Sequence, residues 1–197
     1  MSVKPEDSLK LQGRVEILAI ARKTGEILCN ETIPNIVLYQ GNAEVIKTLF
    51  TITPATKPRL ITRMAIGDQG TIPADSQVAK VPTKDLAGLY HEIYRADADS
   101  STQTTSGSTN QCELIATFNA TSVPLSAFSN PAQPRVNEVG LVIIDPTAAG
   151  GIVRAPVISP AIPASDETVA SIRCFKSIPF EAANDVSVTI RYTIFLA

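Results

Sequence analysis

The sequence predicts a mainly β protein in which antiparallel sheets form a sandwich-like arrangement, with one short helix and long loops. Apolar and polar residues alternate over several segments, most regularly over residues 185–197, where Val186, Val188 and Ile190 fall on one face and polar residues on the other. Such alternation is typical of a strand with one buried face. The 14 prolines interrupt helices and favour loops. The predicted class is a β-sandwich with a helix packed on it, or a mixed α+β sheet.

The first third of the chain is predicted to contain a hairpin followed by the helix. Over residues 14–32 two alternating segments flank a turn at Lys23-Thr24-Gly25, and Gly25 supplies the left-handed conformation that such turns need. Over residues 39–50 apolar side chains recur with helical spacing, and Pro54 follows them. Because this helix is short, we expect it to cover one face of a sheet.

The middle of the chain is predicted to alternate strands with polar loops. Residues 60–66 form an apolar strand that leads into a long loop. The aromatic and β-branched residues of segment 86–95 favour a short helical turn near Asp85 and then a strand, although their spacing also fits a helical face. Residues 98–111 are polar and lack apolar anchors, so we interpret them as a hairpin tip or exposed loop.

The last part of the chain is predicted to supply most of the remaining sheet. Residues 112–123 alternate cleanly and predict a strand, and residues 124–134 predict a loop. Residues 136–145 are apolar on both faces, so we expect them to lie in the centre of a sheet. Three prolines make residues 156–163 an extended connector before a strand at 168–178.

Length and composition predict a single domain over residues 1–197, divided into an N-terminal extension and hairpin (1–34), a central module (35–145) and a C-terminal connector with strands (146–197). The net charge of −2 and the charged fraction of 18% give no basis for binding nucleic acid or an anionic membrane. The first residues lack the apolar region of a signal peptide, and no apolar run is long enough to span a membrane. We therefore expect synthesis in the cytoplasm.

The sequence predicts no cofactor and no metal site. Cys29, Cys112 and Cys174 are far apart and form no Cys-x-x-Cys pair, which favours reduced, buried thiols over metal ligands or disulfides. His91 is the only histidine, and metal sites need several donors, so we expect it at the surface or at an interface.

A glycine-containing segment after the strand at 60–66 is the first candidate for a functional site. Gly67-Asp68-Gln69-Gly70-Thr71 follows a strand as a phosphate loop would, but it lacks the Gly-Lys-Ser/Thr ending and the alternating oxygen ligands of a calcium loop. We therefore predict that Gly67 and Gly70 take turn conformations and that the Asp68 side chain caps that turn.

Three charged residues are the next candidates, for structural or interface roles. Glu92 and Arg95 could be a catalytic acid and its positioning residue, but such a pair is more often a salt bridge or a subunit contact. Glu138 precedes an apolar run, so we expect it at a sheet edge in an ion pair with a cation such as Arg95 or Arg173, because an unpaired buried charge is very unfavourable. No Gly-x-Ser-x-Gly elbow is present, and no catalytic residue is predicted.

Two groups of motifs resemble the N-terminal module of phage tail fibre proteins. The first is ITRMAIGD at 61–68, followed by a Thr/Pro loop and by Leu86, Leu89 and EIYR at 92–95. The second is IATF at 115–118 followed by NEVGL at 137–141. The resemblance covers roughly residues 35–145, the predicted helix included. It departs from the family in having an extra N-terminal hairpin and no long fibre shaft.

The resemblance implies a non-enzymatic structural protein of a tailed-phage virion, located in the tail, the baseplate or the fibre-attachment region. It also implies a homo-oligomer, with a trimer favoured, that contacts other virion proteins. One alternative is a capsid decoration or cement protein. A second is a receptor- or carbohydrate-binding β-sandwich, although a chain without Trp and with four Tyr has few aromatic residues for a sugar site, and nothing in the sequence supports a host receptor.

Overall fold

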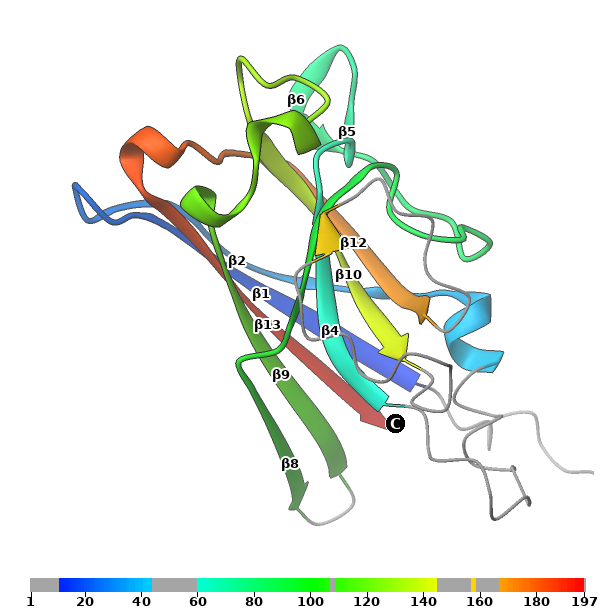
Figure 1. Ribbon diagram of the computed structural model, residues 1–197. Helices are drawn as coiled ribbons and strands as arrows, with labels where there is room; N and C mark the ends of the chain where they lie inside the picture. Colours follow the sequence, from blue (N-terminus) through cyan, green and yellow to red (C-terminus); the bar gives the residue numbers. More distant parts are fainter. Residues whose placement is uncertain (1–10, 44–59, 107–108, 145–156, 159–166, 197) are drawn as a thin grey trace, which may run out of the picture.

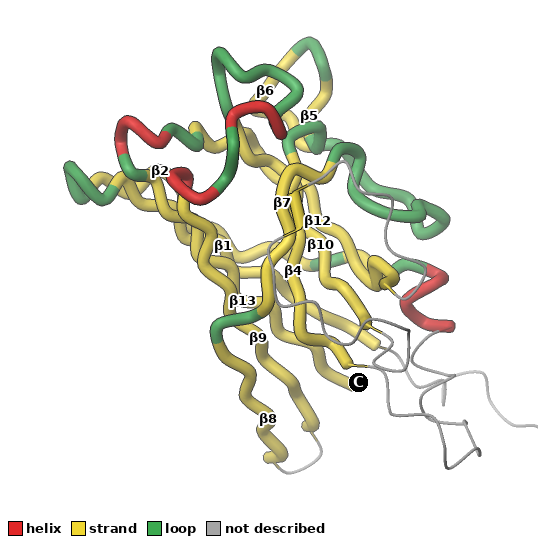
Figure 2. Tube along the Cα trace, in the orientation of Figure 1, coloured by secondary structure: helices red, strands yellow, loops and turns green. Residues whose placement is uncertain are grey.

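The structure is a computed structural model that describes residues 11–43, 60–106, 109–144, 157–158 and 167–196. It is mainly β, with two large antiparallel sheets, a small hairpin and one short helix, as the sequence predicts (Figures 1 and 2). The first large sheet has the order β2-β1-β13-β9-β8, and the second has the order β11-β7-β4-β10-β12-β3. Among the described residues, none belongs to a helix with the length and hydropathy that crossing a membrane requires.

The first sheet is built from the predicted hairpin, the C-terminal strand and a second hairpin. Its strands are β1 (Leu11–Ala21), β2 (Glu26–Pro34), β8 (Ser100–Ser106), β9 (Thr109–Asn119) and β13 (Val186–Leu196). Gly25 has a φ of 74°, so the predicted turn is correct. β13 lies between β1 and β9 and pairs with both without a register shift, which places its apolar face in the core.

The second sheet is built from segments spread over most of the chain. Its strands are β3 (Ile36–Val37), β4 (Leu60–Gly67), β7 (Glu92–Asp97), β10 (Arg135–Ile144), β11 (Val157–Ile158) and β12 (Glu167–Pro179). β10 pairs with β4 on one side and β12 on the other, which confirms its predicted central position. Successive residues of β10 are buried on opposite faces, as a strand covered on both sides requires.

The main core lies between the two sheets. Apolar side chains of both sheets meet there, and Tyr94 of β7 packs edge-on against Phe118 of β9 with ring centroids 6.3 Å apart. Each fully buried aliphatic or aromatic side chain contributes about 1.5–3 kcal/mol. The residues contributed by the first sheet include Val15, Ile17, Leu114, Phe118, Val188 and Ile190, and those contributed by the second include Met64, Ile66, Val139, Leu141 and Phe175.

A smaller core covers the other face of the second sheet. Ala65, Val142 and Ile172 form it with Leu38, and the half-buried Leu86 and Leu89 pack against it. The predicted helix begins at Tyr39, directly after this core residue; residues 39–43 are helical and the rest of the predicted segment lies outside the described residues. Most of the predicted proline connector also lies outside them.

The segment at 98–111, predicted as a hairpin tip or exposed loop, lies in an exposed hairpin, but most of it is paired strand, so the loop interpretation was wrong. β8 pairs residue for residue with β9, from Ser100 opposite Ile115 to Ser106 opposite Thr109. The segment shows no alternation of apolar and polar residues because an outer strand of a sheet can be exposed on both faces, as residues 101–104 are. Backbone pairing with β9 and the β propensity of threonine then suffice to hold it.

The long loop after β4 also contains secondary structure. β5 (Thr71–Ile72) and β6 (Asp75–Ala79) form a short hairpin, and Lys80 N donates to Gly70 O at 2.8 Å. The segment between β9 and β10, residues 120–134, contains two short 3-10 helices, η2 (Ala120–Ser122) and η3 (Leu125–Ala127). Both segments lie at the same end of the molecule (Figure 1).

Candidate functional site

Glu138 joins the segments that the sequence marked as separate motifs. It lies in β10 opposite Gly67 of β4, and its side chain is fully buried. Its Oε1 accepts hydrogen bonds from Gln69 N at 3.1 Å and His91 N at 2.9 Å, and its Oε2 accepts one from Tyr90 N at 2.8 Å. We call this arrangement the Glu138 anchor. It fixes the start of the 68–91 loop to the end of that loop.

The Glu138 anchor replaces the ion pair that the sequence predicted. Glu138 lies in a central strand, not at a sheet edge, and within the described residues its carboxylate meets backbone amides, not Arg95 or Arg173. Backbone N–H groups satisfy a buried carboxylate as a cation would, and sequence patterns do not reveal them. Burial raises the pKa of Glu138, and the three amide hydrogen bonds oppose that rise.

Gly67 and Gly70 are required for close packing and not for turn geometry. Among the described glycines only Gly25 has a left-handed φ, so the predicted turn conformations at positions 67 and 70 were wrong. A Cβ at Gly67 would lie 2.6 Å from Glu138 Cγ, and one at Gly70 would lie 2.8 Å from Glu138 Cβ. Both distances are far inside van der Waals contact. The two glycines therefore make room for the Glu138 anchor.

Glu92 and Arg95 of β7 form an ion pair with each other. Arg95 Nε donates to Glu92 Oε1 and Arg95 Nη2 to Glu92 Oε2, both at 2.7 Å. The two side chains are largely buried, at 2% and 12% exposure for Arg95 and Glu92. This two-pronged geometry satisfies the carboxylate with a planar guanidinium. Both carboxylate oxygens of Glu92 therefore accept hydrogen bonds from Arg95, so neither is free to take a proton from a substrate. The pair stabilises β7.

The sequence predicted that Asp68 caps its own turn, and that prediction was wrong. The Asp68 side chain instead binds a segment far away in the sequence. Its Oδ2 accepts from Ser129 N at 2.6 Å, and its Oδ1 accepts from the Ser129 hydroxyl at 2.9 Å. His91 Nδ1 lies 2.6 Å from the same Oδ1. Asp68 therefore ties the loop after η3 to the end of β4.

Ser129, His91 and Asp68 are the residue types of a hydrolytic triad, but their geometry differs from one. In a triad, one ring nitrogen of histidine contacts the serine and the other contacts the aspartate. Here both Ser129 Oγ, at 3.0 Å, and Asp68 Oδ1 approach Nδ1 of His91. The serine hydroxyl also donates directly to the aspartate. In this closed triangle His91 cannot take the serine proton on one ring nitrogen while Asp68 holds the other, which is the arrangement that a triad uses.

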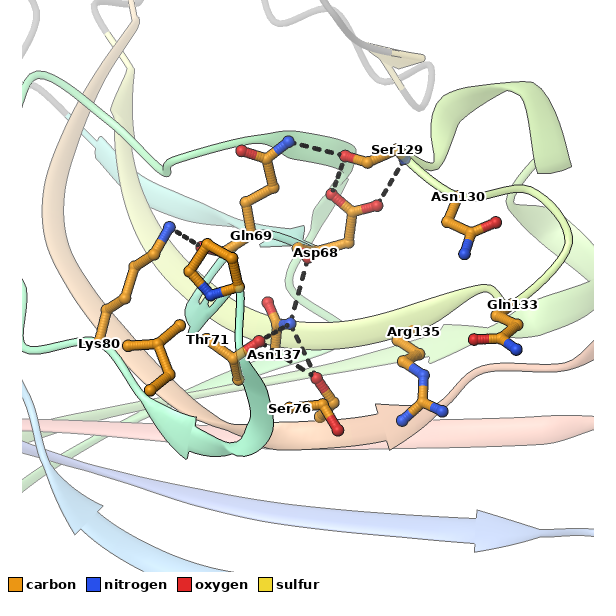
Figure 3. A pocket seen from close by; sticks show the side chains of 13 residues that line it. Asp68, Gln69, Thr71, Ser76, Lys80, Ser129, Asn130, Gln133, Arg135 and Asn137 are labelled. Atoms are coloured by element: carbon orange, nitrogen blue, oxygen red, sulfur yellow. Dashed lines mark hydrogen bonds between the residues drawn. The ribbon is translucent and has the colours of Figure 1, made fainter.

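A polar cavity of about 420 Å³ lies beside this triangle, between the β5–β6 hairpin and the loop that precedes β10 (Figure 3). Its volume falls in the range of small-molecule sites. The Arg135 side chain lines it and makes no hydrogen bond or ion pair with any described residue, whereas Lys80 donates to Gln69 O at 2.6 Å. The other polar residues that line it are Asp68, Gln69, Thr71, Ser76, Ser129, Asn130, Gln133, Asn137 and Ser177.

Asn137 forms the floor of this cavity and fixes its shape. Its Oδ1 accepts from Gly70 N at 2.6 Å, and its Nδ2 donates to Asp68 O at 3.1 Å and to Ser177 Oγ at 3.0 Å. The side chain is 2% exposed. Because the Asn137 amide is buried and both its oxygen and its nitrogen are hydrogen-bonded, it fixes the position of the cavity floor.

The thiols and the acidic residues offer little further chemistry in the described part of the chain. No group of three or more His, Cys, Asp or Glu residues there could hold a metal ion. The three cysteines are free thiols. Burial, and then the nearby Glu138, raise the pKa of Cys174 to about 12, and burial also raises the pKa of Cys29 and of Cys112.

Sequence reasoning did not find the contact of His91 with Asp68 and Ser129, or the cavity. The three residues lie far apart along the chain, and nothing in their local sequence signals that they meet. Asn137, next to Glu138, belongs to a recognised motif, but its role in the cavity depends on β4 and β12 lying beside β10.

No protein-family model and no curated protein sequence matches this chain.

Proposed function

We propose that this chain is a non-enzymatic structural component of a tailed-phage virion, in the tail, the baseplate or the fibre-attachment region, where it acts through contacts between subunits. The observation that supports this most is the Glu138 anchor. It lies where the two groups of motifs that resemble the phage tail fibre module meet. Glu138 is paired opposite Gly67 of β4, Asn137 Nδ2 donates to Asp68 O at 3.1 Å, and Glu138 accepts from Gln69 N, directly after the first motif. Two groups of motifs that lie far apart in the sequence are therefore in contact in the fold.

Each marker residue has a packing role that explains why its residue type is needed. Gly67 leaves room for the Glu138 carboxylate, and a Cβ at Gly140 would lie 2.5 Å from Leu89 Cδ1. Glu92 and Arg95 bond to each other within β7. Residues that build a scaffold in this way favour a structural protein over an enzyme.

The state of the acidic residues and thiols favours the non-enzymatic role for the same reason. Asp68, Glu92 and Glu138 each accept hydrogen bonds on both carboxylate oxygens from residues of the protein itself. A general base needs a free oxygen within reach of a substrate proton. The raised pKa of each cysteine disfavours the thiolate that a nucleophile requires.

Detection in particles tests this proposal directly. Virions of the phage that encodes the chain would be purified, stripped of loosely bound protein and analysed by quantitative mass spectrometry. We expect the chain in the particles at about a dozen copies, a multiple of three or six, as closed symmetric assemblies of a tail require. Its absence from stripped particles would refute the proposal, and hundreds of copies would favour the capsid decoration or cement role instead.

The polar cavity favours a second candidate, a receptor- or carbohydrate-binding role. Its lining offers amide and hydroxyl groups that match a hydrophilic ligand, and Arg135 adds a cation whose side chain has no partner among the described residues. An array of neutral and acidic glycans would be probed with the wild-type chain, with Arg135→Ala, and with Arg14→Ala as a control for a surface cation. Binding of acidic glycans that only Arg135→Ala abolishes would establish this role, and an array without signal would reject it.

A further inference from the structure

β8 is an outer strand of the first sheet that projects from the body of the protein (Figure 1). It pairs with β9 on its inner side, and none of the described strands lies on its outer side. The pairing with β9 continues over all seven residues without a register shift. The strand therefore presents a regular row of backbone N–H and C=O groups on its outer edge.

β8 lacks the features by which proteins block unwanted pairing at such an edge. Charged side chains, prolines and bulges are the usual means. β8 has the sequence SSTQTTS and contains neither charge nor proline. β2, at the opposite edge of the same sheet, carries Glu26, Glu31 and Pro34, and its pairing with β1 is interrupted by a register shift. Within the described part of the chain, one edge of the sheet carries these blocking features and the other edge is unpaired.

The sequence of β8 is also close to a palindrome centred on Gln103. Read in both directions from Gln103, Thr102 corresponds to Thr104, Ser101 to Thr105 and Ser100 to Ser106. Two identical antiparallel strands that cross at Gln103 would place each hydroxyl residue opposite a hydroxyl residue and glutamine opposite glutamine. Thr–Thr and Thr–Ser pairs across strands are favourable, and no like charges would meet.

We propose that β8 pairs with β8 of a second copy of this chain, antiparallel and about a two-fold axis through Gln103. The contact would join two five-stranded sheets into one continuous sheet and would satisfy the open edge of both. Because a two-fold contact uses the same surface on both chains, a self-complementary strand is what it requires. The proposal concerns the purified chain and does not rest on its location in a virion.

Charge reversal at Gln103 tests the contact. Gln103 is exposed, so Gln103→Lys and Gln103→Glu should both fold, which circular dichroism would verify. On the two-fold axis each variant places like charges opposite each other, whereas a mixture of the two places opposite charges there. The molar mass would be measured by light scattering after size exclusion at protein concentrations from about 10 μM to 1 mM. The wild-type mass should double over this range, and each variant alone should associate at least about tenfold more weakly. The mixture of the two variants should regain the wild-type association.

Control variants and a second measurement keep the outcome specific. Gln77→Lys and Gln77→Glu make the same charge changes at another exposed strand position, on β6, and should leave association unchanged. Amide hydrogen exchange of residues 100–106 in the wild type should slow as concentration rises. A wild-type chain that stays monomeric, or an oligomer whose mass neither Gln103 variant changes, would overturn the proposal. Loss of association in both variants without recovery in the mixture would assign the β8 edge to a different partner strand and would also overturn it.

Discussion

Gly67→Ala is expected to destabilise the protein strongly, because Gly67 faces the Glu138 anchor. The added Cβ would lie 2.6 Å from Glu138 Cγ and closer still to Glu138 Oε1 and the His91 carbonyl oxygen. None of these atoms can move freely. The carboxylate is held by three backbone amides, and the His91 carbonyl accepts a hydrogen bond from Asp68 N at 3.2 Å.

The size of the loss in stability can be worked out from the overpacking and from the Glu138 hydrogen bonds that the added methyl group would disturb. Overpacking alone costs about 1–3 kcal/mol. Displacing the carboxylate also weakens hydrogen bonds to a charged group, each worth about 1.5–3 kcal/mol. We therefore expect Gly67→Ala to lower the free energy of unfolding by about 3–5 kcal/mol, a large part of the roughly 5–15 kcal/mol that domains possess. For a chain of this length that corresponds to a fall in Tm of about 6–20 °C.

Urea unfolding followed by circular dichroism measures the effect, and Gly88→Ala is the matched control. A Cβ at Gly88 would meet only Val169 Cγ2, at 3.9 Å, which is ordinary contact. The control should be neutral or up to about 1 kcal/mol more stable, because alanine restricts the unfolded chain. A Gly67→Ala protein within about 0.5 kcal/mol of wild type, which is the range of ordinary surface substitutions, would show that the anchor is not rigid and would refute this reasoning.

Two further predictions concern titratable groups. Because burial raises the pKa of Glu138, the folded state binds its proton more tightly than the unfolded state, so the stability that this group contributes is greatest below its ordinary pKa and is lost as pH rises through the raised value. In urea unfolding at several pH values between about 4 and 7, the free energy of unfolding of Glu138→Gln, measured relative to wild type, should therefore increase as pH rises. Glu26→Gln is the surface control. A decrease with rising pH would show that the amide hydrogen bonds lower the pKa of Glu138 by more than burial raises it. Cys174, with a pKa of about 12, should react with iodoacetamide at pH 8 at least about a thousandfold more slowly than a free thiol, and rapid labelling of the native protein, located by peptide mass spectrometry, would contradict its burial.

Local sequence patterns correctly predicted the strands that bury one or both faces. Alternation over Val15, Ile17 and Ala19 and over Val186, Val188 and Ile190 marks the faces that fill the main core. The apolar run in β10 marks a central strand for the same reason. β8 was missed because a strand exposed on both faces has no apolar pattern, and backbone pairing leaves no trace in side-chain composition.

The roles within the candidate site could not be predicted in the same way. Glu138 was recognised as important, but its assigned ion pair was wrong, because backbone amides from Gln69, Tyr90 and His91 take the place of a cation. The glycines at 67 and 70 were recognised as special, but the reason was wrong. A glycine can serve a turn or a close approach, and only the neighbouring strand shows which one applies.

The sequence by itself determined that this protein is a β-rich chain with a helix near residue 39, a hairpin at its start and a central strand at β10. These properties depend on side-chain periodicity, which is written over neighbouring residues. The tertiary structure alone decided what Asp68, His91, Ser129 and Glu138 contact, because those contacts span from 23 to 69 residues of chain. Such contacts form only when β4, β7 and β10 lie side by side in one sheet, which places these polar groups within hydrogen-bonding distance and buries Glu138 and the Asp68 side chain away from water.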